Sequence, residues 1–332
     1  MKIMSMLKLI KQAKNIIITS HQNSDIDAVL SCYVMKRLID KVNPYAEVDI
    51  VTSKINMPAK KVLEKLNILS TIKEADYVPE YDLCIFIDVN NPLHLGPLGD
   101  KIRPDKPIII IDHHKPSVNM PLNALVSIID DQAVATAEVV CDIIQEICVK
   151  PSKEEALCLL LGILSDSRRL LIGTVKTSRD IAFLLSCGAS LSEAVSILYM
   201  PLSYSEKIAR LKASQRATIF SLGQWIIAIS NVGSYEASAA RALVDLGADI
   251  AAVCNDLDEG SRLCVRASEE FIRTTNIHLG EELEKMGLIM SGSGGGHASA
   301  ACVSVPRQCN DVLKGFLEMM SNRLKQPLKK ID

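Results

Sequence analysis

The chain has 332 residues, of which 48% are hydrophobic, and its formal net charge is −2. This length suggests two domains with full-sized cores. A net charge near zero argues against binding of long nucleic acids through a broad basic face, but it leaves room for a local pocket that holds a short or small anion.

The N-terminus and the cysteines bear on where the protein works. Lysines at positions 2, 8, 11 and 14 suit an amphipathic helix and interrupt any signal-peptide core. The longest apolar run, residues 156–164, is too short to cross a bilayer. None of the ten cysteines forms a C-x-x-C pair, so we expect free thiols in a reducing compartment. We therefore expect a cytoplasmic protein with no membrane partner, and a homodimer remains open.

The first strand is predicted over residues 15–20, an apolar β-branched run that ends at His21. A helix follows from Ala28, which places Asp25 and Asp27 in the connecting loop. The N-terminus of that helix also favours anions. Each carboxylate alone has a structural explanation, Asp27 as an N-cap and Asp25 as a turn residue. Those roles do not explain why His21 lies beside them.

Further strands are predicted over residues 47–52 and 81–88, with a helix over 58–69 between them. The second of these strands ends in the carboxylate of Asp88. Four consecutive isoleucines then predict a strand over residues 108–111 that is buried on both faces, as in a parallel sheet.

Three polar residues, Asp112, His113 and His114, follow that isoleucine run. In open α/β sheets, ligands bind outside the carboxyl ends of the strands. Aspartate and histidine are also ligands for divalent metals. The sequence therefore predicts a metal site at this edge of the sheet.

Helices are predicted over residues 130–148 and 153–164, and the second is apolar almost all round and therefore buried. It ends at Asp166, which is followed by Arg168 and Arg169. Alone, this segment reads equally well as a surface turn. Beside the other strand ends, it supplies a fourth metal-directed carboxylate with adjacent phosphate-binding groups.

Alternating strands and helices predict an α/β fold, with a parallel-sheet N-terminal domain flanked by helices and a smaller α/β C-terminal domain. We expect a catalytic domain over residues 1–195, a helical linker over 196–214 and a substrate-binding domain over 215–327. The C-terminal domain contains predicted strands at 225–230, 251–254 and 261–268, and a helix at 277–286.

A glycine-rich run marks the C-terminal domain: Gly294, Gly295 and Gly296 precede His297. Glycine backbone can surround an anion with N–H groups. The alanine-rich segment behind the glycines is predicted to begin a helix, whose N-terminal dipole would also attract an anion. A flexible hairpin loop is the alternative. Period-two alternation over residues 261–268 places Arg266 and Ser268 on one strand face.

Together these motifs resemble the DHH phosphoesterase superfamily, in the two-domain form of nanoRNases and 3'-phosphoadenosine 5'-phosphate (pAp) phosphatases. The matching residues of the N-terminal domain are His21-x-x-x-Asp25-x-Asp27, Asp88, Asp112-His113-His114 and Asp166. The glycine run with His297, preceded by Arg266, resembles the C-terminal domain associated with that superfamily.

The resemblance implies two metal ions, usually manganese, with magnesium as the alternative. It assigns His21 and Asp25 to one ion, and Asp27, His113 and Asp166 to the other, with Asp88 bridging both. It also implies that His114 faces the scissile phosphate with support from Asp112. Substrate binding falls to a set of residues from both domains: Arg168, Arg266, Ser268, Gly294, Gly295, Gly296 and His297.

The chain departs from the family pattern at Ser24 and Ile26, where proline and glycine are usual, and at Ser167 and the two arginines that follow it. The second departure affects substrate identity more than chemistry. We expect a hydrolase that cleaves short single-stranded oligonucleotides (nanoRNA) or pAp with metal-activated water. A cyclic or linear dinucleotide phosphodiesterase is the alternative, and a non-catalytic nucleotide sensor is the second. A pyrophosphatase and a long-DNA exonuclease are less favoured.

Overall fold

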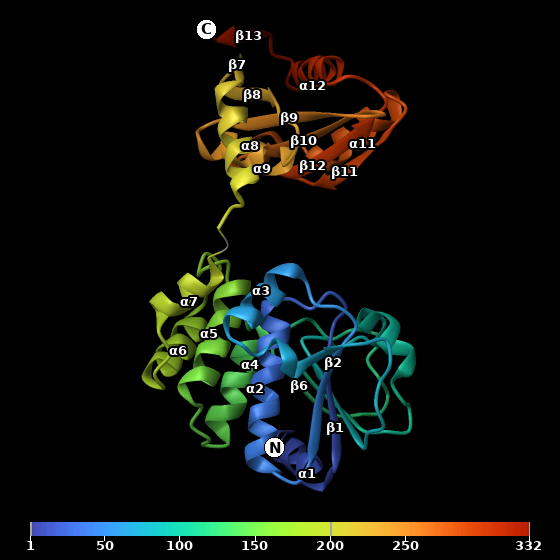
Figure 1. Cartoon of the computed structure of the whole chain (residues 1–332), viewed down its shortest axis with the longest axis vertical. Helices are drawn as coiled ribbons and strands as arrows, with labels where there is room; N and C mark the ends of the chain where they lie inside the picture. The colour runs from blue at the N-terminus through green and yellow to red at the C-terminus, as the bar shows by residue number, and fades with distance from the viewer. Residues whose placement is uncertain (1, 200, 332) are drawn as a thin grey trace. The chain divides into compact units, whose positions relative to one another are not determined.

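The structure, a computed structural model, describes residues 2–199 and 201–331, which form two compact units divided at that gap (Figure 1). Each unit has its own sheet and its own hydrophobic cores. The predicted α/β class is confirmed. Among the described residues no single helix is long and apolar enough to cross a membrane, although α6 (Val175–Ser186) and α7 (Leu191–Leu198), bent by 108°, reach that length and composition as a pair.

The first unit contains a six-stranded, fully parallel sheet in the order β3-β2-β1-β4-β5-β6. Four of its strands are those predicted, and β5 is buried at every position, as its isoleucines require. The two edge strands, β3 and β6, were not predicted, because β3 is short and β6 is only half-buried. The strands are β1 (Asn15–Ser20), β2 (Glu47–Thr52), β3 (Ile72–Glu74), β4 (Leu83–Ile87), β5 (Ile108–Asp112) and β6 (Ala124–Ile129).

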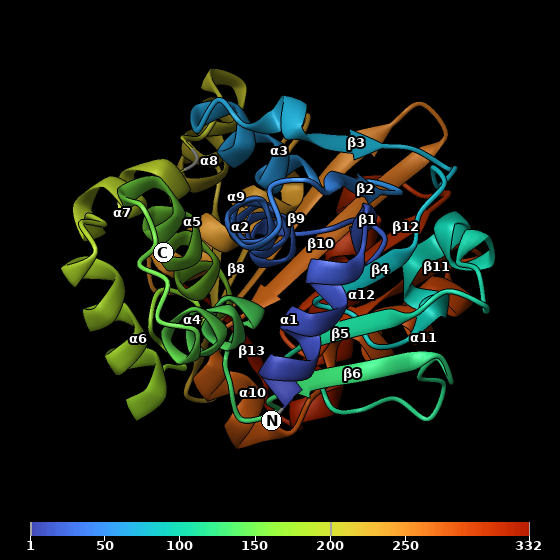
Figure 2. The ribbon, with the colours of Figure 1, turned by 90° about the horizontal axis from the view of Figure 1, so that it is seen from below.

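Helices pack against one face of this sheet, and the 3-10 segment η2 (Pro92–Lys101) with its neighbouring loops covers the other. In Figure 2, α2, α4 and α5 gather to the left of β4, β5 and β6. The remaining elements of the unit are α1 (Lys2–Gln12), α2 (Ile26–Val42), α3 (Met57–Lys65), η1 (Leu69–Thr71), α4 (Thr136–Glu146) and α5 (Lys153–Asp166).

The start of α2 differs from the prediction. The helix begins at Ile26, and Asp25 is its N-cap, with Oδ1 accepting the N–H of Ala28 at 3.0 Å. Asp27 therefore lies in the first helical turn, and its predicted place in the preceding loop is wrong. Asp25 and Asp27 therefore exchange the cap and non-cap roles that the sequence suggested. A carboxylate at either position can cap a helix, and the sequence does not show which one does.

The strand order positions a binding crevice. The chain leaves β1 toward β2 and leaves β4 toward β5, so the neighbouring strands β1 and β4 send their connections to opposite sides. In open parallel sheets, ligands bind at the carboxyl ends beside such a reversal. The predicted metal-facing residues His21 and Asp88 directly follow these two strands.

The second unit has a seven-stranded sheet in the order β11-β12-β10-β9-β8-β7-β13, in which only the β8–β9 pair is parallel. Its strands are β7 (Thr218–Leu222), β8 (Trp225–Asn231), β9 (Ile250–Leu257), β10 (Gly260–Ala267), β11 (Ser293–His297), β12 (Ala300–Val305) and β13 (Leu328–Ile331). Its helices are α8 (Tyr204–Gln215), α9 (Glu236–Asp245), α10 (Glu269–Thr275), α11 (Leu279–Ile289) and α12 (Cys309–Leu324). Apart from residue 200, which is not described, the predicted linker comprises the end of α7 and most of α8, and α8 packs against α9.

The glycine run forms a strand, not a loop before a helix. Residues 293–297 make β11, which pairs with β12 in a hairpin, so the predicted helix after His297 is wrong. Close packing requires the glycines here. A Cβ on Gly294 would lie 2.3 Å from the Leu283 carbonyl oxygen of α11, and Gly296 adopts a φ of +145° that side chains disfavour.

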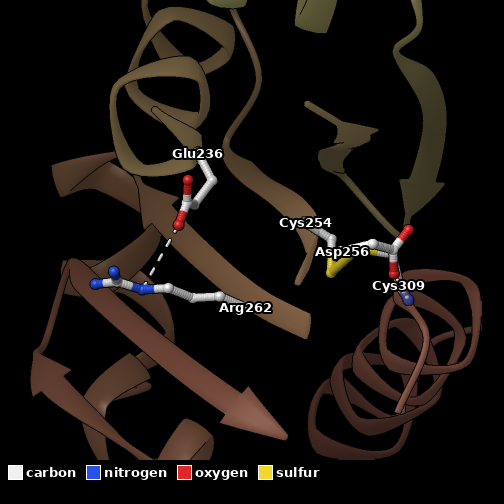
Figure 3. Close-up of a disulfide and its surroundings, with 5 residues drawn as sticks. All are labelled: Glu236, Cys254, Asp256, Arg262 and Cys309. Carbon is white, nitrogen blue, oxygen red and sulfur yellow. Dashed lines mark hydrogen bonds and ion pairs between the residues drawn. A yellow bond between two sulfur atoms is a disulfide. The ribbon is translucent and has the colours of Figure 1, made fainter. Parts of the chain in front are cut away.

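Four cysteines of the second unit form disulfides, so the prediction that all ten are free is wrong. Register in the β10–β12 pair sets Cys264 opposite Cys302, with the Cα atoms 4.1 Å apart. Cys254 of β9 bonds Cys309, the first residue of α12, whose backbone N–H donates to Asp256 at 2.8 Å (Figure 3). Cysteine usage therefore no longer supports a reducing compartment.

Candidate metal centre

Strand ends and helix ends of the first unit deliver the predicted metal-facing residues to one place. His21 follows β1, Asp88 follows β4, and Asp166 ends α5. They line a cavity of about 660 Å³, and Asp27 lies fully buried at 0% exposure. The lining residues are His21, Gln22, Asp25, Asp88, Val89, Asn90, Leu93, His94, Asp112, His113, His114, Lys115, Ser117 and Asp166.

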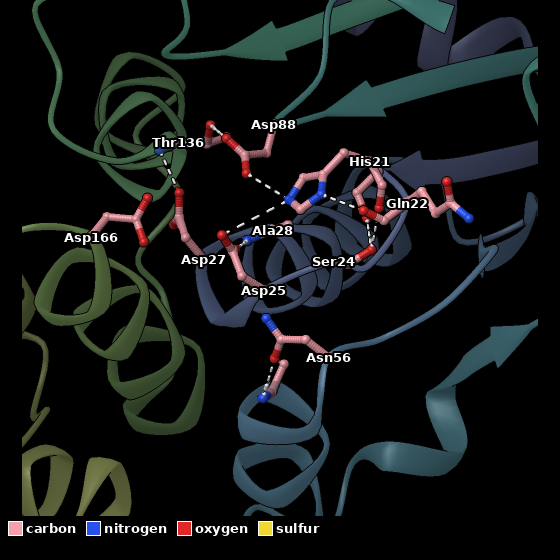
Figure 4. A network of polar contacts seen from close by, with 12 residues as sticks. His21, Gln22, Ser24, Asp25, Asp27, Ala28, Asn56, Asp88, Thr136 and Asp166 are labelled. Atoms are coloured by element: carbon pink, nitrogen blue, oxygen red, sulfur yellow. Dashed lines mark hydrogen bonds and ion pairs between the residues drawn. The ribbon is translucent and has the colours of Figure 1, made fainter. Parts of the chain in front are cut away.

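Three overlapping groups have ligand atoms within 4.8 Å of one another, and Asp88 belongs to two of them. One carboxylate oxygen of Asp88 lies 3.5 Å from Nε2 of His21, and the other lies 3.4 Å from Nε2 of His113. Figure 4 shows Asp88 and Asp25 both directed at the His21 ring. The groups are His21-Asp25-Asp88, Asp88-His113-His114 and Asp27-His113-Asp166. This arrangement gives Asp88 the geometry of a bridging ligand.

The imidazoles are oriented as metal ligands. Nδ1 of His113 contacts the Ala133 carbonyl at 3.2 Å, and Nδ1 of His21 contacts the Gln22 carbonyl at 3.0 Å. A carbonyl accepts only from a protonated Nδ1, which leaves the Nε2 lone pair of each neutral ring free. Nε2 of His113 is buried without a hydrogen-bond partner among the described residues. Such an atom, facing carboxylates, fits a divalent cation.

Electrostatics also favour a cation. Burial, followed by the charges of Asp25 and Asp88, raises the pKa of Asp166 to about 7. Burial and nearby carboxylates raise the pKa of Asp25 and Asp27 as well. Burial also opposes ionisation of Asp88, but its hydrogen bond with His21 holds its pKa below the usual value. These carboxylates repel one another unless protons or metal ions neutralise them.

Backbone conformation explains why aspartate suits position 88. Asp88 has a φ of +59°, the left-handed region, where aspartate and asparagine are enriched among residues with a side chain. From the end of β4, its carboxylate lies between His21, which follows β1, and His113, which follows β5. The residue is only 3% exposed, so the carboxylate is held in place.

Asp112 supports the site without belonging to any of the three groups of candidate ligands. Its Oδ1 accepts the backbone N–H of His114 at 3.1 Å and lies 2.9 Å from the ring Nδ1 of the same residue. Its Oδ2 accepts the side-chain N–H of Asn90 at 2.6 Å. Asn90 also accepts the N–H of Ser117 at 2.9 Å, which secures the segment after His114. The sequence analysis missed Asn90, whose only signal was its place two residues after Asp88.

The predicted substrate-binding residues are divided between the two units. Arg168 lines a separate cavity of about 420 Å³ that also includes Arg169 and Ile26. In the second unit, Arg266 is half-buried and donates to the Val265 carbonyl at 3.1 Å. Ser268 lies just after β10 and caps α10 by accepting the N–H of Phe271 at 3.1 Å, while His297 is exposed at the end of β11.

The titrating groups predict that the metal-free protein loses stability as pH rises. In the folded protein the pKa of Asp166 is raised to about 7. The proton that this carboxyl holds therefore stabilises the folded state, fully at a pH below the pKa of the unfolded chain. This contribution to stability is lost as the pH rises to about 7. Burial lowers the pKa of His21, but Asp88 and the Gln22 carbonyl raise it to about 9, so its contribution is lost between about 6.5 and 9.

Thermal unfolding with a chelator should therefore give a lower Tm at pH 8.5 than at pH 5.5. Added Mn²⁺ should remove or invert that trend, because a cation replaces the protons. A chelated protein whose Tm rises over this interval would contradict the electrostatic description.

Comparison with known proteins agrees with both units. Residues 15–163 match the DHH family, N-terminal domain, and residues 209–326 match the DHHA1 domain. An uncharacterized protein of Methanocaldococcus jannaschii is 28% identical over 98% of this chain and 99% of its own length.

Two further proteins extend the comparison. A cyclic-di-AMP phosphodiesterase of Listeria monocytogenes is 22% identical over 55% of this chain, and that match spans 29% of the phosphodiesterase. The crystal structure of an exopolyphosphatase-related protein from Bacteroides fragilis shares the fold, with a TM-score of 0.68 at 16% identity, over 98% of this chain and 96% of that one.

Proposed function

The chain belongs to the DHH family and joins its N-terminal domain to a DHHA1 domain, and from this premise we propose a metal-dependent phosphodiesterase that acts on small nucleotides. Members of this family are hydrolases of phosphoesters. The observation that carries the proposal is the position of Asp88 between two imidazoles whose Nε2 atoms face its two oxygens. Such a carboxylate can be shared by two cations.

The donor set favours manganese. Imidazole nitrogens and carboxylate oxygens suit Mn²⁺, and Mg²⁺ less well, and the groups of candidate ligands include no thiolate. His21 and Asp25 would hold one ion, Asp27, His113 and Asp166 the other, and Asp88 both. When bound, two such ions supply a hydroxide near neutral pH and neutralise charge at phosphorus.

His114 is proposed to contact the scissile phosphate. Its hydrogen bond with Asp112 raises the pKa of the ring, which favours the protonated form that donates to a phosphate oxygen. The same hydrogen bond fixes the ring orientation, because Asp112 is itself held by Asn90. The side chain is 58% exposed, so a substrate can reach it.

The DHHA1 domain is proposed to bind the rest of the nucleotide through Arg266, Ser268, the glycines 294–296 and His297. Burial and the charge of Arg241 lower the pKa of the Arg266 guanidinium, and a phosphate anion would relieve both effects. Ser268 accepts the N–H of Phe271, and its hydroxyl donates to no other described residue, so its hydrogen is available to a phosphate. Arg168, with Arg169 in its own cavity, is proposed to hold a further phosphate.

Short substrates fit these features best. The cavity of about 660 Å³ has the size of a small-ligand site, and the net charge of −2 supplies no long basic track. We propose short oligonucleotides or pAp as substrates. A cyclic or linear dinucleotide is the second candidate, and the similarity to a cyclic-di-AMP phosphodiesterase favours it.

One substrate panel tests the proposal: purified protein with Mn²⁺ against di- to pentanucleotides, pAp, cyclic dinucleotides, pyrophosphate and a long single strand. We expect turnover of one or more small nucleotides, with rates that fall about tenfold or more beyond roughly a pentamer, the scale of small single-strand sites. Equal rates on a trimer and on the long strand would sink the length preference. Tight nucleotide binding without turnover would replace the enzyme with a sensor.

A further inference from the structure

The start of α4 lacks a cap of its own. Its N-cap residue, Ala135, has no side-chain hydrogen bond to offer, and the first N–H groups of a helix need partners. Asp27 of α2 supplies them. Its Oδ2 accepts the N–H of Thr136 at 2.7 Å, and its Oδ1 accepts the N–H of Ala137 at 3.0 Å. A candidate metal ligand on one helix thus caps the N-terminus of another.

The side chain of Thr136 holds a second candidate ligand. Its hydroxyl donates to Oδ1 of Asp88 at 2.7 Å, and the residue is fully buried. Figure 4 shows Thr136 between the two carboxylates. One residue therefore contacts Asp27 through its backbone and Asp88 through its side chain.

A glycine in α5 leaves space for the same arrangement. Gly162 lies in the middle of a helix whose neighbouring residues are all buried, where glycine costs about 0.5–1 kcal/mol relative to alanine. A Cβ at this position would lie 2.6 Å from Oδ1 of Asp27 and 3.0 Å from Cβ of Ala137. The first contact is far below van der Waals distance, so an alanine would displace the carboxylate.

We propose that Thr136 is a positioning residue that fixes the carboxylates of both Asp27 and Asp88 for metal binding, and that Gly162 keeps the space that this geometry requires. The inference rests on the proposed metal centre. The physical reason is general: groups that hydrogen-bond a metal's ligands set their orientation, and their loss costs about 10- to 100-fold in metal affinity or activity. Each carboxylate keeps lone pairs that these hydrogen bonds do not use.

Two substitutions of Thr136 test its side chain by calorimetric Mn²⁺ titration. This measurement needs no substrate, so a negative result would count against the role of Thr136 and not against the proposed hydrolysis. Thr136→Val keeps the shape and removes the donor, and it should raise the Kd for Mn²⁺ about 10- to 100-fold. Thr136→Ser keeps the donor and should bind Mn²⁺ nearly as the wild type does. Wild-type affinity in the valine variant, or equal losses in both variants, would overturn the role of the hydroxyl.

Gly162→Ala tests the Asp27 contact independently. Alanine normally stabilises a helix, but here it should weaken Mn²⁺ binding by about tenfold or more, because it moves a carboxylate away from its ligand position. The matched control is Gly315→Ala in α12, where the new Cβ would meet the flexible end of Met290. Circular dichroism of the metal-free variants checks that each one folds. If Gly162→Ala and Gly315→Ala both bind Mn²⁺ as the wild type does, the inference about Gly162 is wrong.

Discussion

Replacing Asp88 with asparagine is expected to abolish hydrolysis, with a fall in kcat/KM of about 10³-fold or more. The reason is that the bound ions would stabilise the transition state by several kcal/mol, and both would lose the carboxylate that they share. Asp88 faces His21 and His113 with different oxygens, so its loss affects both candidate ion positions. The amide has the same shape but carries no charge. Metal titration of the variant should show weakened binding at both positions.

Asparagine is a sharper test than alanine at this position. Asp88 adopts a φ of +59°, which asparagine tolerates, whereas alanine would add backbone strain of roughly 1 kcal/mol or more. Asp49→Asn makes the same change at an exposed carboxylate of β2, paired with Lys73 at 2.8 Å, and should leave turnover unchanged. Full activity of Asp88→Asn with added Mn²⁺ would falsify the bridging role.

Replacing His114 with alanine is expected to lower kcat by about 10²- to 10⁴-fold, the range for a lost proton donor, while the affinity for Mn²⁺ stays close to that of the wild type. The side chain is 58% exposed, so truncation opens no core cavity. His278→Ala, which removes an imidazole that caps α11 in the second unit, is the matched control. Kinetics and metal titration must be measured on the same preparations.

The pair of measurements separates two roles for His114. Together with Asp88 and His113 it forms one of the groups that can hold an ion. If His114→Ala loses Mn²⁺ affinity in proportion to kcat, then the ring is a ligand and does not act on the phosphate. Asp112→Asn should show a milder form of the same kinetic defect, since it leaves the His114 ring in place and weakens the hydrogen bonds through which Asp112 orients it.

Strand ends were predictable because their causes are local. Four consecutive β-branched isoleucines favour a strand buried on both faces of a sheet, and the polar residues behind them then lie at its carboxyl edge. For the same reason His21 and Asp88 could be placed from the sequence. Contacts between distant residues left no such pattern. The Thr136 hydroxyl meets a carboxylate 48 positions away, and a threonine at a helix start is otherwise an ordinary residue.

Glycine and cysteine were misread for related physical reasons. In a sequence, Gly294 and Gly296 indicate a loop, but here they let a strand lie close against α11 and turn into a hairpin. Disulfide partners depend on how distant elements meet: the β10–β12 register pairs Cys264 with Cys302, 38 residues apart, and the start of α12 meets Cys254 of β9, 55 residues from its partner. Register is set by the packing of whole strands, so spacing along the chain does not reveal it.

The capping of α4 by Asp27 has a consequence for the order in which the protein folds. The two hydrogen bonds join residues 109 and 110 positions apart, so they close a loop that spans most of the first unit. We expect contacts this distant to form after the intervening β2, β4 and β5 have assembled, because the chain entropy of so large a loop must first be offset by other contacts. We therefore expect metal binding that needs Asp27 in place to be a late event, which reports that residues 27–137 have reached their native topology.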